Sequence, residues 1–118
     1  MVVTFCTIRP LLAQAKENDI LSIELSETSK KVLLIIAQCE SGNRHTVNGK
    51  VLRGRVNNLD IGLFQINLKY HKETAKKLGL NLFKRRDNYL YAKYLLLTQG
   101  LKPWSASGKC QRKMLLTI

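Results

Sequence analysis

The sequence predicts an α+β fold that is mainly helical and carries a small β-hairpin region. Helices are expected over residues 29–39, 72–78 and 87–99, and the first and last of these have apolar residues at helical spacing. A glycine lies shortly after each stretch, where a left-handed residue commonly ends a helix. Asn48-Gly49 is a dipeptide typical of hairpin turns, and residues 50–56 alternate weakly between polar and apolar.

Length and charge restrict the class of protein. A chain of 118 residues is long enough for one domain with a real core. Its formal charge of +12 and its pI near 10.0 predict an anionic partner, because potential of one sign accumulates over the whole surface. Bacterial cell-wall polymers and nucleic acids are both anionic, so charge alone does not choose between them.

Several other classes lack their sequence signatures. Neither an aromatic-interleaved RNA-binding pattern nor a basic zipper occurs, which makes nucleic acid the second choice of partner. His45 has no further His or Cys at ligand spacing, so no metal is expected. No uninterrupted run approaches the roughly 20 apolar residues of a membrane span, and the mature protein is expected to be soluble.

The N-terminal residues 1–15 allow two interpretations. They are apolar at first, are interrupted by Arg9-Pro10, and end in Ala13-Gln14-Ala15, which fits a small-x-small cleavage site. The stretch is either a degenerate or truncated leader, with the domain proper over residues 16–118, or the first strand or helix of the domain. Residues 16–28 are polar with four aliphatic positions, and we expect a short helix or strand there that packs against the helix over 29–39.

The helix over residues 29–39 leads directly to an acidic residue. Ser26 or Thr28 is available as its N-cap, and Ser41-Gly42-Asn43 ends it. Glu40 lies four residues after Ile36 and so continues the apolar face of the helix. A carboxyl drawn into apolar surroundings resists ionisation and can donate a proton near neutral pH. The alternative is an ordinary exposed glutamate at a helix end.

A second block, residues 60–67, reads Asp-Ile-Gly-Leu-Phe-Gln-Ile-Asn. If residues 63–67 are extended, Gln65 and Asn67 lie on one face while the apolar residues anchor the segment in the core. Two amides beside the carboxyl of Asp60 can hydrogen-bond the hydroxyl and N-acetyl groups of a saccharide. The alternative is a core strand preceded by a turn, which needs no ligand.

Aromatic residues give weaker indications. Tyr70 and His71 are candidates for the border of a sugar-binding groove, with plain packing or surface positions as the alternative. Tyr94 lies at helical spacing in the predicted helix 87–99, where core packing is the competing interpretation. Trp104 follows Lys102-Pro103 and can either stack on a sugar face or close the core.

Taken in order, these motifs resemble the lysozyme superfamily over roughly residues 30–110. Glu-Ser-Gly, then Asp-x-Gly-Leu-Phe-Gln-Ile-Asn, then Pro-Trp-Ser-Ala-Ser-x-x-Cys follow one another. The chain is most similar to SLT-type lytic transglycosylase domains, through Glu40-Ser41 and residues 62–66. It also resembles c-type lysozymes, which have an aspartate where Asp60 stands.

The resemblance implies a lysozyme-like fold and a set of site residues. Glu40 and Asp60 are expected to be catalytic, and substrate-binding roles are expected for Ser41, Gln65, Asn67, Tyr94 and Trp104. No cofactor is implied. The expected partner is the glycan strand of peptidoglycan in an anionic cell wall, and the protein is expected to be a secreted or cell-envelope monomer. The fold would bring Cys39 close to Cys110, so the two either form a disulfide or Cys39 is a small buried hydrophobe.

Three functions follow as hypotheses. In a lytic transglycosylase, which the motifs favour, Glu40 acts as both acid and base on the β-1,4 bond between N-acetylmuramic acid and N-acetylglucosamine. In a hydrolytic lysozyme, Asp60 assists Glu40, as in the lysozyme example of retaining glycosidases. The third is a non-catalytic basic module that binds the cell wall or nucleic acid, since folds outlive their activities.

Overall fold

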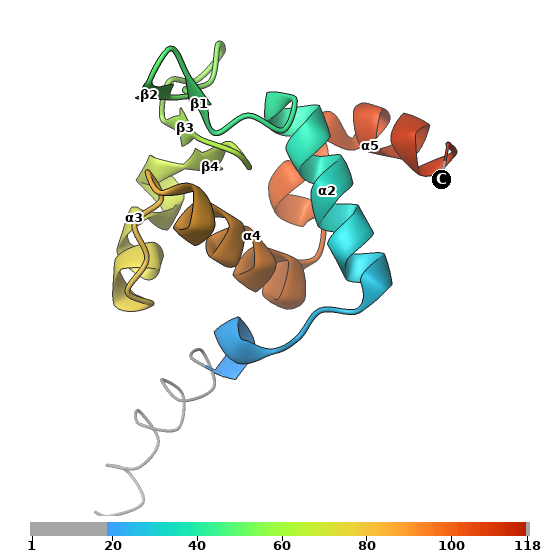
Figure 1. Cartoon of the computed structure of the whole chain (residues 1–118), viewed down its shortest axis with the longest axis horizontal. Coiled ribbons are helices and arrows are strands. Elements are labelled where there is room, and N and C mark those ends of the chain that lie inside the picture. The colour runs from blue at the N-terminus through green and yellow to red at the C-terminus, as the bar shows by residue number, and fades with distance from the viewer. Residues whose placement is uncertain (1–18, 118) are drawn as a thin grey trace, which may run out of the picture.

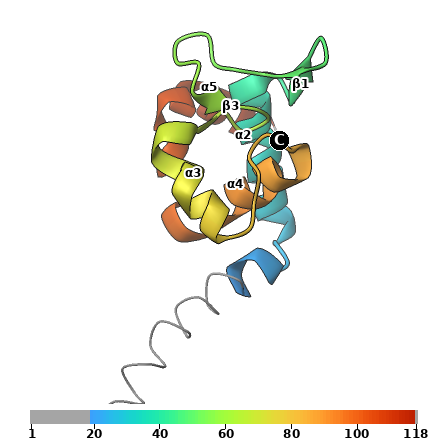
Figure 2. The same cartoon turned by 90° about the vertical axis from the view of Figure 1, so that its left-hand side faces the viewer.

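The computed structural model describes residues 19–117, which are mainly helical with two small antiparallel hairpins (Figure 1). This confirms the predicted fold class. The suspected leader, residues 1–15, and Cys6 within it lie outside the described residues. Figure 1 shows the hairpins gathered beside the C-terminal end of α2, with α3 and α4 beneath them and α5 on the other side of α2, and Figure 2 shows the same arrangement turned by 90°.

The helix α2, Glu27–Ser41, carries the first acidic candidate. The Ser26 hydroxyl accepts a hydrogen bond from the Ser29 amide and so caps the first turn, and Gly42 ends the helix in the left-handed conformation. The helix is therefore two residues longer at each end than the predicted range. Before it, residues 19–22 form a helical turn, and Leu25 joins the core. A short helical element is therefore present at this place, with Leu21 packed against the core cluster and its carbonyl oxygen accepting from Lys93 of α4, while the predicted packing against α2 stays a prediction.

The first hairpin joins β1, Thr46–Val47, to β2, Lys50–Val51. Asn48 and Gly49 form its turn with φ of 54° and 77°, the backbone that this dipeptide favours. The second hairpin joins β3, Asp60–Ile61, to β4, Ile66–Asn67, with Asp60 opposite Asn67.

The condition that residues 63–67 are extended, on which Gln65 and Asn67 would share one face, is met only over residues 66–67. The chain turns between β3 and β4, and both Gly62 and Gln65 have positive φ, of 73° and 50°. A Cβ atom on Gly62 would lie 2.5 Å from the His45 ring, so only glycine allows this close approach. The turn places the adjacent Leu63 and Phe64 in the core, which an extended strand would not do because its side chains alternate.

The remaining helices complete the core. α3, Leu68–Lys77, begins four residues before the predicted start, because the Asn67 side chain accepts a hydrogen bond from the Lys69 amide and caps it. α4, Arg85–Gln99, begins two residues before the predicted range and ends with it. The 3₁₀ helix η1, Lys102–Ser107, and α5, Gly108–Leu115, were not predicted as elements.

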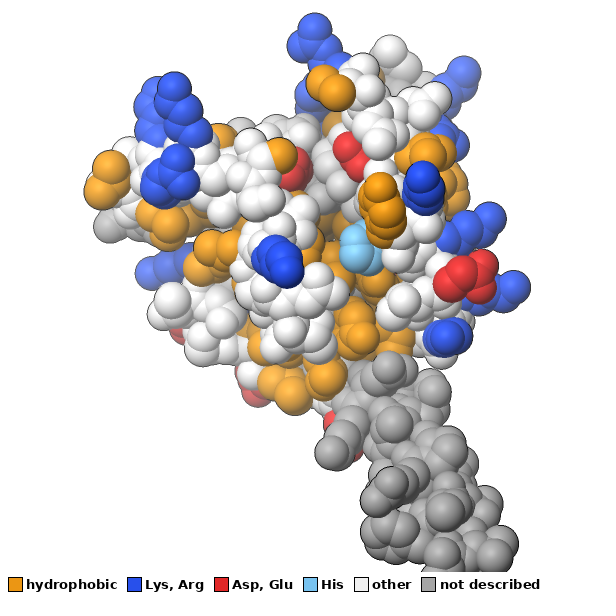
Figure 3. All heavy atoms as spheres, turned by 180° about the vertical axis from the view of Figure 1, so that it is seen from behind, with side chains coloured by type: hydrophobic (Ala, Val, Ile, Leu, Met, Phe, Trp, Pro, Cys, Tyr) orange, Lys and Arg blue, Asp and Glu red, His pale blue; other side chains and the backbone are white. Residues whose placement is uncertain are grey.

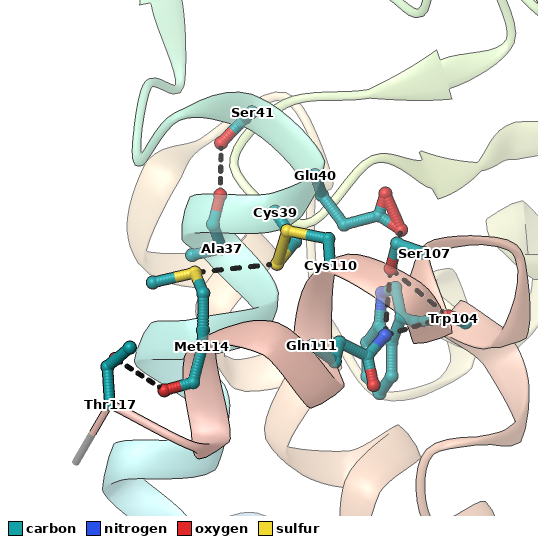
Figure 4. Close-up of a disulfide and its surroundings, with 10 residues drawn as sticks. All are labelled: Ala37, Cys39, Glu40, Ser41, Trp104, Ser107, Cys110, Gln111, Met114 and Thr117. Atoms are coloured by element: carbon teal, nitrogen blue, oxygen red, sulfur yellow. Dashed lines mark hydrogen bonds between the residues drawn. A yellow bond between two sulfur atoms is a disulfide. The ribbon is translucent and has the colours of Figure 1, made fainter.

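A disulfide joins Cys39 in α2 to Cys110 in α5, with 5.9 Å between their Cα atoms (Figure 4). The predicted pairing is therefore present. Because the two cysteines are 71 residues apart, the bond restricts the unfolded chain strongly, which corresponds to about 4 kcal/mol in the chain-entropy account. It fastens the end of α2 that carries Glu40 to the segment that follows Trp104.

Asn88 connects α4 to the β3–β4 turn. This side chain is fully buried, and its oxygen accepts a hydrogen bond from the Phe64 amide at 2.9 Å. Its amide nitrogen donates to the carbonyl oxygens of Ile61 and Leu82, both at 3.0 Å. Since buried backbone groups require partners, this one side chain replaces the strand pairing that a tight turn cannot supply.

Asn88→Ala tests this connection. The substitution leaves buried backbone groups of Phe64, Ile61 and Leu82 without partners, so we expect the free energy of unfolding to fall by about 3 kcal/mol in urea denaturation. Asn58→Ala, in an exposed loop, serves as the control and is expected to change it by less than about 0.5 kcal/mol. A loss for Asn88→Ala no larger than that of the control would contradict the proposed importance of the connection.

Candidate active site

Glu40 lies in the last turn of α2 with its carboxyl directed toward Ser107 (Figure 4). The side chain is half-buried, and burial raises its pKa from the ordinary value of 4.5 to about 7. The hydrogen bond from Ser107 lowers this pKa and the charge of Asp60 raises it further. A carboxyl with a pKa near 7 is partly protonated at neutral pH and can act as a general acid.

Glu40 opens onto a cleft of about 630 Å³. The hollow in the face shown in Figure 3 carries acidic side chains, with Lys and Arg over the surrounding surface. Glu40 and Asp60 line the same cleft, from α2 and β3, and the predicted Ser41, Gln65, Asn67 and Trp104 line it with them. Tyr70 and His71, the candidates for its border, line it as well.

Asp60 is held in place by its partner across the hairpin. The Asn67 side-chain amide donates to Asp60 Oδ1 at 2.9 Å, while the Asn67 oxygen caps α3. One asparagine thus fixes both the second carboxyl of the cleft and the start of the next helix. Asn67 can therefore contact a ligand only through its second amide hydrogen and the remaining lone pair of its side-chain oxygen.

Gln65 is oriented by the turn that precedes it. Its side-chain nitrogen donates to the Gly62 carbonyl oxygen at 2.9 Å. Gly54, in the loop between β2 and β3, lies so close that a Cβ atom there would be 3.1 Å from Gln65 Oε1 and 2.4 Å from the Asn57 carbonyl oxygen. Glycine at position 54 therefore lets this loop close against the cleft wall.

Ser41 and His45 hold the β3–β4 turn against α2. The buried Ser41 hydroxyl lies 2.7 Å from the Leu63 carbonyl oxygen and 3.0 Å from that of Ala37, and it accepts from the Arg44 amide. The Leu63 amide donates to His45 Nδ1, which leaves the other ring nitrogen to donate to the Phe83 carbonyl oxygen. Ser41 was predicted to bind substrate, but its hydroxyl is engaged in these internal hydrogen bonds.

Tyr94 and Trp104, the two aromatic residues expected to bind substrate, differ in position. Trp104 is 3% exposed, donates from Nε1 to the Phe64 carbonyl oxygen and forms part of the cleft wall, so it closes the core and borders the cleft at once. Tyr94 packs against the core with its ring 5.6 Å from that of Tyr91. The structure does not place Tyr94 among the residues that line the cleft, which favours the core-packing interpretation.

The sequence did not indicate Ser107, whose hydroxyl lies 3.3 Å from Glu40 Oε1. It belongs to the Pro-Trp-Ser-Ala-Ser-x-x-Cys motif, three residues before the disulfide cysteine, and that spacing is the only sequence signal of its place. Arg44, Arg53 and Arg55 also line the cleft and were not predicted as site residues. Two of them have other partners, since the Arg44 and Arg53 guanidinium groups donate to the carbonyl oxygens of Ser41 and Asn58.

No family model, curated protein or solved structure matches the chain in comparisons. Within residues 19–117, no group of three His, Cys, Asp or Glu side chains is placed to hold a metal ion. None of the helices in this range has the length and apolar character needed to cross a membrane.

The raised pKa of Glu40 predicts a pH-dependent stability. The folded chain holds the Glu40 proton more tightly than the unfolded chain does. Protonated Glu40 therefore contributes its full share to the free energy of unfolding below pH 4.5, and this contribution is lost as the pH rises through about 7. Glu40→Gln removes the ionisation. We expect it to raise the free energy of unfolding at pH 8 by about 1–2 kcal/mol, a value reduced for partial exposure, and to change it little at pH 4.

Urea denaturation at the two pH values measures this difference. Glu73→Gln, which neutralises an exposed carboxyl on α3, serves as the matched control. If Glu40→Gln and Glu73→Gln have the same effect at pH 8, the ionised Glu40 does not destabilise the folded state.

Proposed function

We propose that this chain is a lysozyme-like enzyme that cleaves the β-1,4 bond between N-acetylmuramic acid and N-acetylglucosamine in peptidoglycan, as a lytic transglycosylase. The observation that carries the proposal is the half-buried Glu40, with a pKa of about 7, on the wall of an open cleft. The residues of both sequence motifs meet in that cleft, although Glu40 and Asp60 are 20 positions apart in the chain.

In the proposed reaction, Glu40 first acts as an acid. Its proton passes to the glycosidic oxygen, the bond from that oxygen to C1 of the muramic acid breaks, and the N-acetylglucosamine side leaves as an alcohol. The ionised Glu40 then takes the proton of the muramoyl 6-hydroxyl, whose oxygen bonds to C1 and closes a 1,6-anhydro ring. The acetamido group of the substrate can assist at C1, so no second carboxylate is required.

Hydrolysis is the second candidate, and the position of Asp60 favours it. Asp60 lines the same cleft, and its charge contributes to the raised pKa of Glu40. In this version Asp60 stabilises or traps the cationic sugar and water completes the reaction.

The charges around the cleft support an anionic substrate. Arg44, Arg53 and Arg55 line it, and the chain as a whole carries a formal charge of +12. The Cys39–Cys110 disulfide supports an oxidising compartment, in agreement with action at a cell wall outside the cytoplasm.

Mass spectrometry of muropeptides released from purified peptidoglycan tests the proposal. The wild-type chain is expected to release products that end in 1,6-anhydromuramic acid. Glu40→Gln is expected to slow release by about 10²–10⁴-fold, because it removes the proton donor, while binding to the wall persists. Glu73→Gln controls for the loss of one negative charge. No release by the wild type, or equal loss of binding and release in Glu40→Gln, would leave only the non-catalytic binding module.

Asp60→Asn separates the two chemistries. The substituted side chain keeps an oxygen that can accept the hydrogen bond from Asn67, so the hairpin should be preserved. As a transglycosylase, the variant is expected to retain its rate within about tenfold and to give anhydro products. A loss of about 10²-fold or more, together with reducing-end products from the wild type, would identify a hydrolase in which Asp60 is catalytic.

A further inference from the structure

Ser107 lies between Glu40 and a backbone carbonyl (Figure 4). Its hydroxyl oxygen is 3.3 Å from Glu40 Oε1 and 3.1 Å from the Trp104 carbonyl oxygen. Both neighbours accept hydrogen bonds, but a hydroxyl has only one hydrogen to donate. The hydrogen of Ser107 therefore has two alternative positions, and only one of them contacts the proposed catalytic acid.

Gln111 determines how the Ser107 hydroxyl is used. This side chain is 5% exposed, lies one helical turn further along the chain, and donates from Nε2 to Ser107 Oγ and to the Trp104 carbonyl oxygen, both at 2.8 Å. Because Ser107 accepts from Gln111, its own hydrogen is directed to Glu40 or to Trp104. The Trp104 carbonyl already has a donor in Gln111, so it loses no necessary bond when the hydrogen turns away.

We propose that Ser107 is a positioning residue that donates its hydrogen to the ionised form of Glu40 and returns it to the Trp104 carbonyl when Glu40 is protonated. Its role in catalysis rests on the proposed function, in which Glu40 gives up a proton and then takes one back. A donor that follows the ionisation of Glu40 stabilises the carboxylate formed in the first half of that cycle. Gln111 keeps the hydroxyl aligned in both states.

The covalent structure keeps this arrangement together. Cys39 immediately precedes Glu40, and Cys110 follows Ser107 by three residues, so the disulfide joins the two segments beside their hydrogen bond (Figure 4). The other charged or titratable residues that line the cleft with Glu40 are Asp60 of β3, Arg44 after α2, Arg53 and Arg55 of the β2–β3 loop, and Tyr70 and His71 of α3. The variants below leave all of these unchanged.

The direct test follows the side-chain carboxyl of Glu40 by NMR over a pH titration, which needs no substrate. Removing a donor to the carboxylate must raise its pKa, so we expect the midpoint in Ser107→Ala to rise by about half to one pH unit above the wild-type value. Ser107→Thr keeps a hydroxyl and is expected to restore the wild-type midpoint. Ser105→Ala, at an exposed position of the same η1 helix, is the matched control and is expected to leave it unchanged.

Gln111→Met provides a second variant, because it removes the nitrogen that aligns the hydroxyl without altering Ser107 itself. We expect a smaller rise of the Glu40 midpoint than in Ser107→Ala. An unchanged midpoint in both variants, or a failure of Ser107→Thr to restore it, would overturn the proposal.

The pH dependence of kcat/KM on soluble glycan strands gives the catalytic readout. Activity should fall at high pH as Glu40 ionises, and Ser107→Ala should move this fall to higher pH by the same interval as the NMR midpoint. A shifted NMR midpoint without any glycan cleavage by the wild type would refute the proposed function but keep the Ser107–Glu40 contact. Cleavage that depends on Glu40 but has the same pH profile in Ser107→Ala would refute the positioning role alone.

Discussion

The buried turn between β3 and β4 is the constraint on which the rest of the structure depends. Its backbone cannot pair as a strand, yet its amides and carbonyls lie in the core and need partners. Four side chains from four parts of the chain supply them, namely Ser41, His45, Asn88 and Trp104. Each of these hydrogen bonds holds its own segment against the turn. The same hydrogen bonds therefore position the segments that form the cleft beside it.

The position of Glu40 in this fold lowers the stability of the folded state when its carboxyl is ionised. Placed at the end of an apolar helix, its carboxyl loses part of its hydration, which raises its pKa to about 7 and disfavours the ionised folded state. The Cys39–Cys110 disulfide fastens this helix end at the next residue.

The charged residues of the cleft are not the main influence on the pKa of Glu40. Arg44, Arg53 and Arg55 are among the residues that line the cleft, but burial is the largest influence on Glu40 and keeps its pKa high. A cation in direct contact with the carboxyl would lower that pKa and remove the acid. The Glu40 carboxyl instead accepts a hydrogen bond from the neutral hydroxyl of Ser107, which lowers the pKa less than burial raises it.

The sequence by itself determined the local features of the protein. The helices α2, α3 and α4, the Ser26 cap, the Gly42 end and the Asn48-Gly49 turn follow from local sequence preferences, and Glu40 was placed by its spacing from Ile36. Only the tertiary structure decided that residues 63–65 turn rather than extend, that Tyr94 packs against the core, and that Ser107 contacts Glu40 across 67 positions. These features depend on which distant segments pack against one another, and the spacing of residues within one segment does not predict that packing.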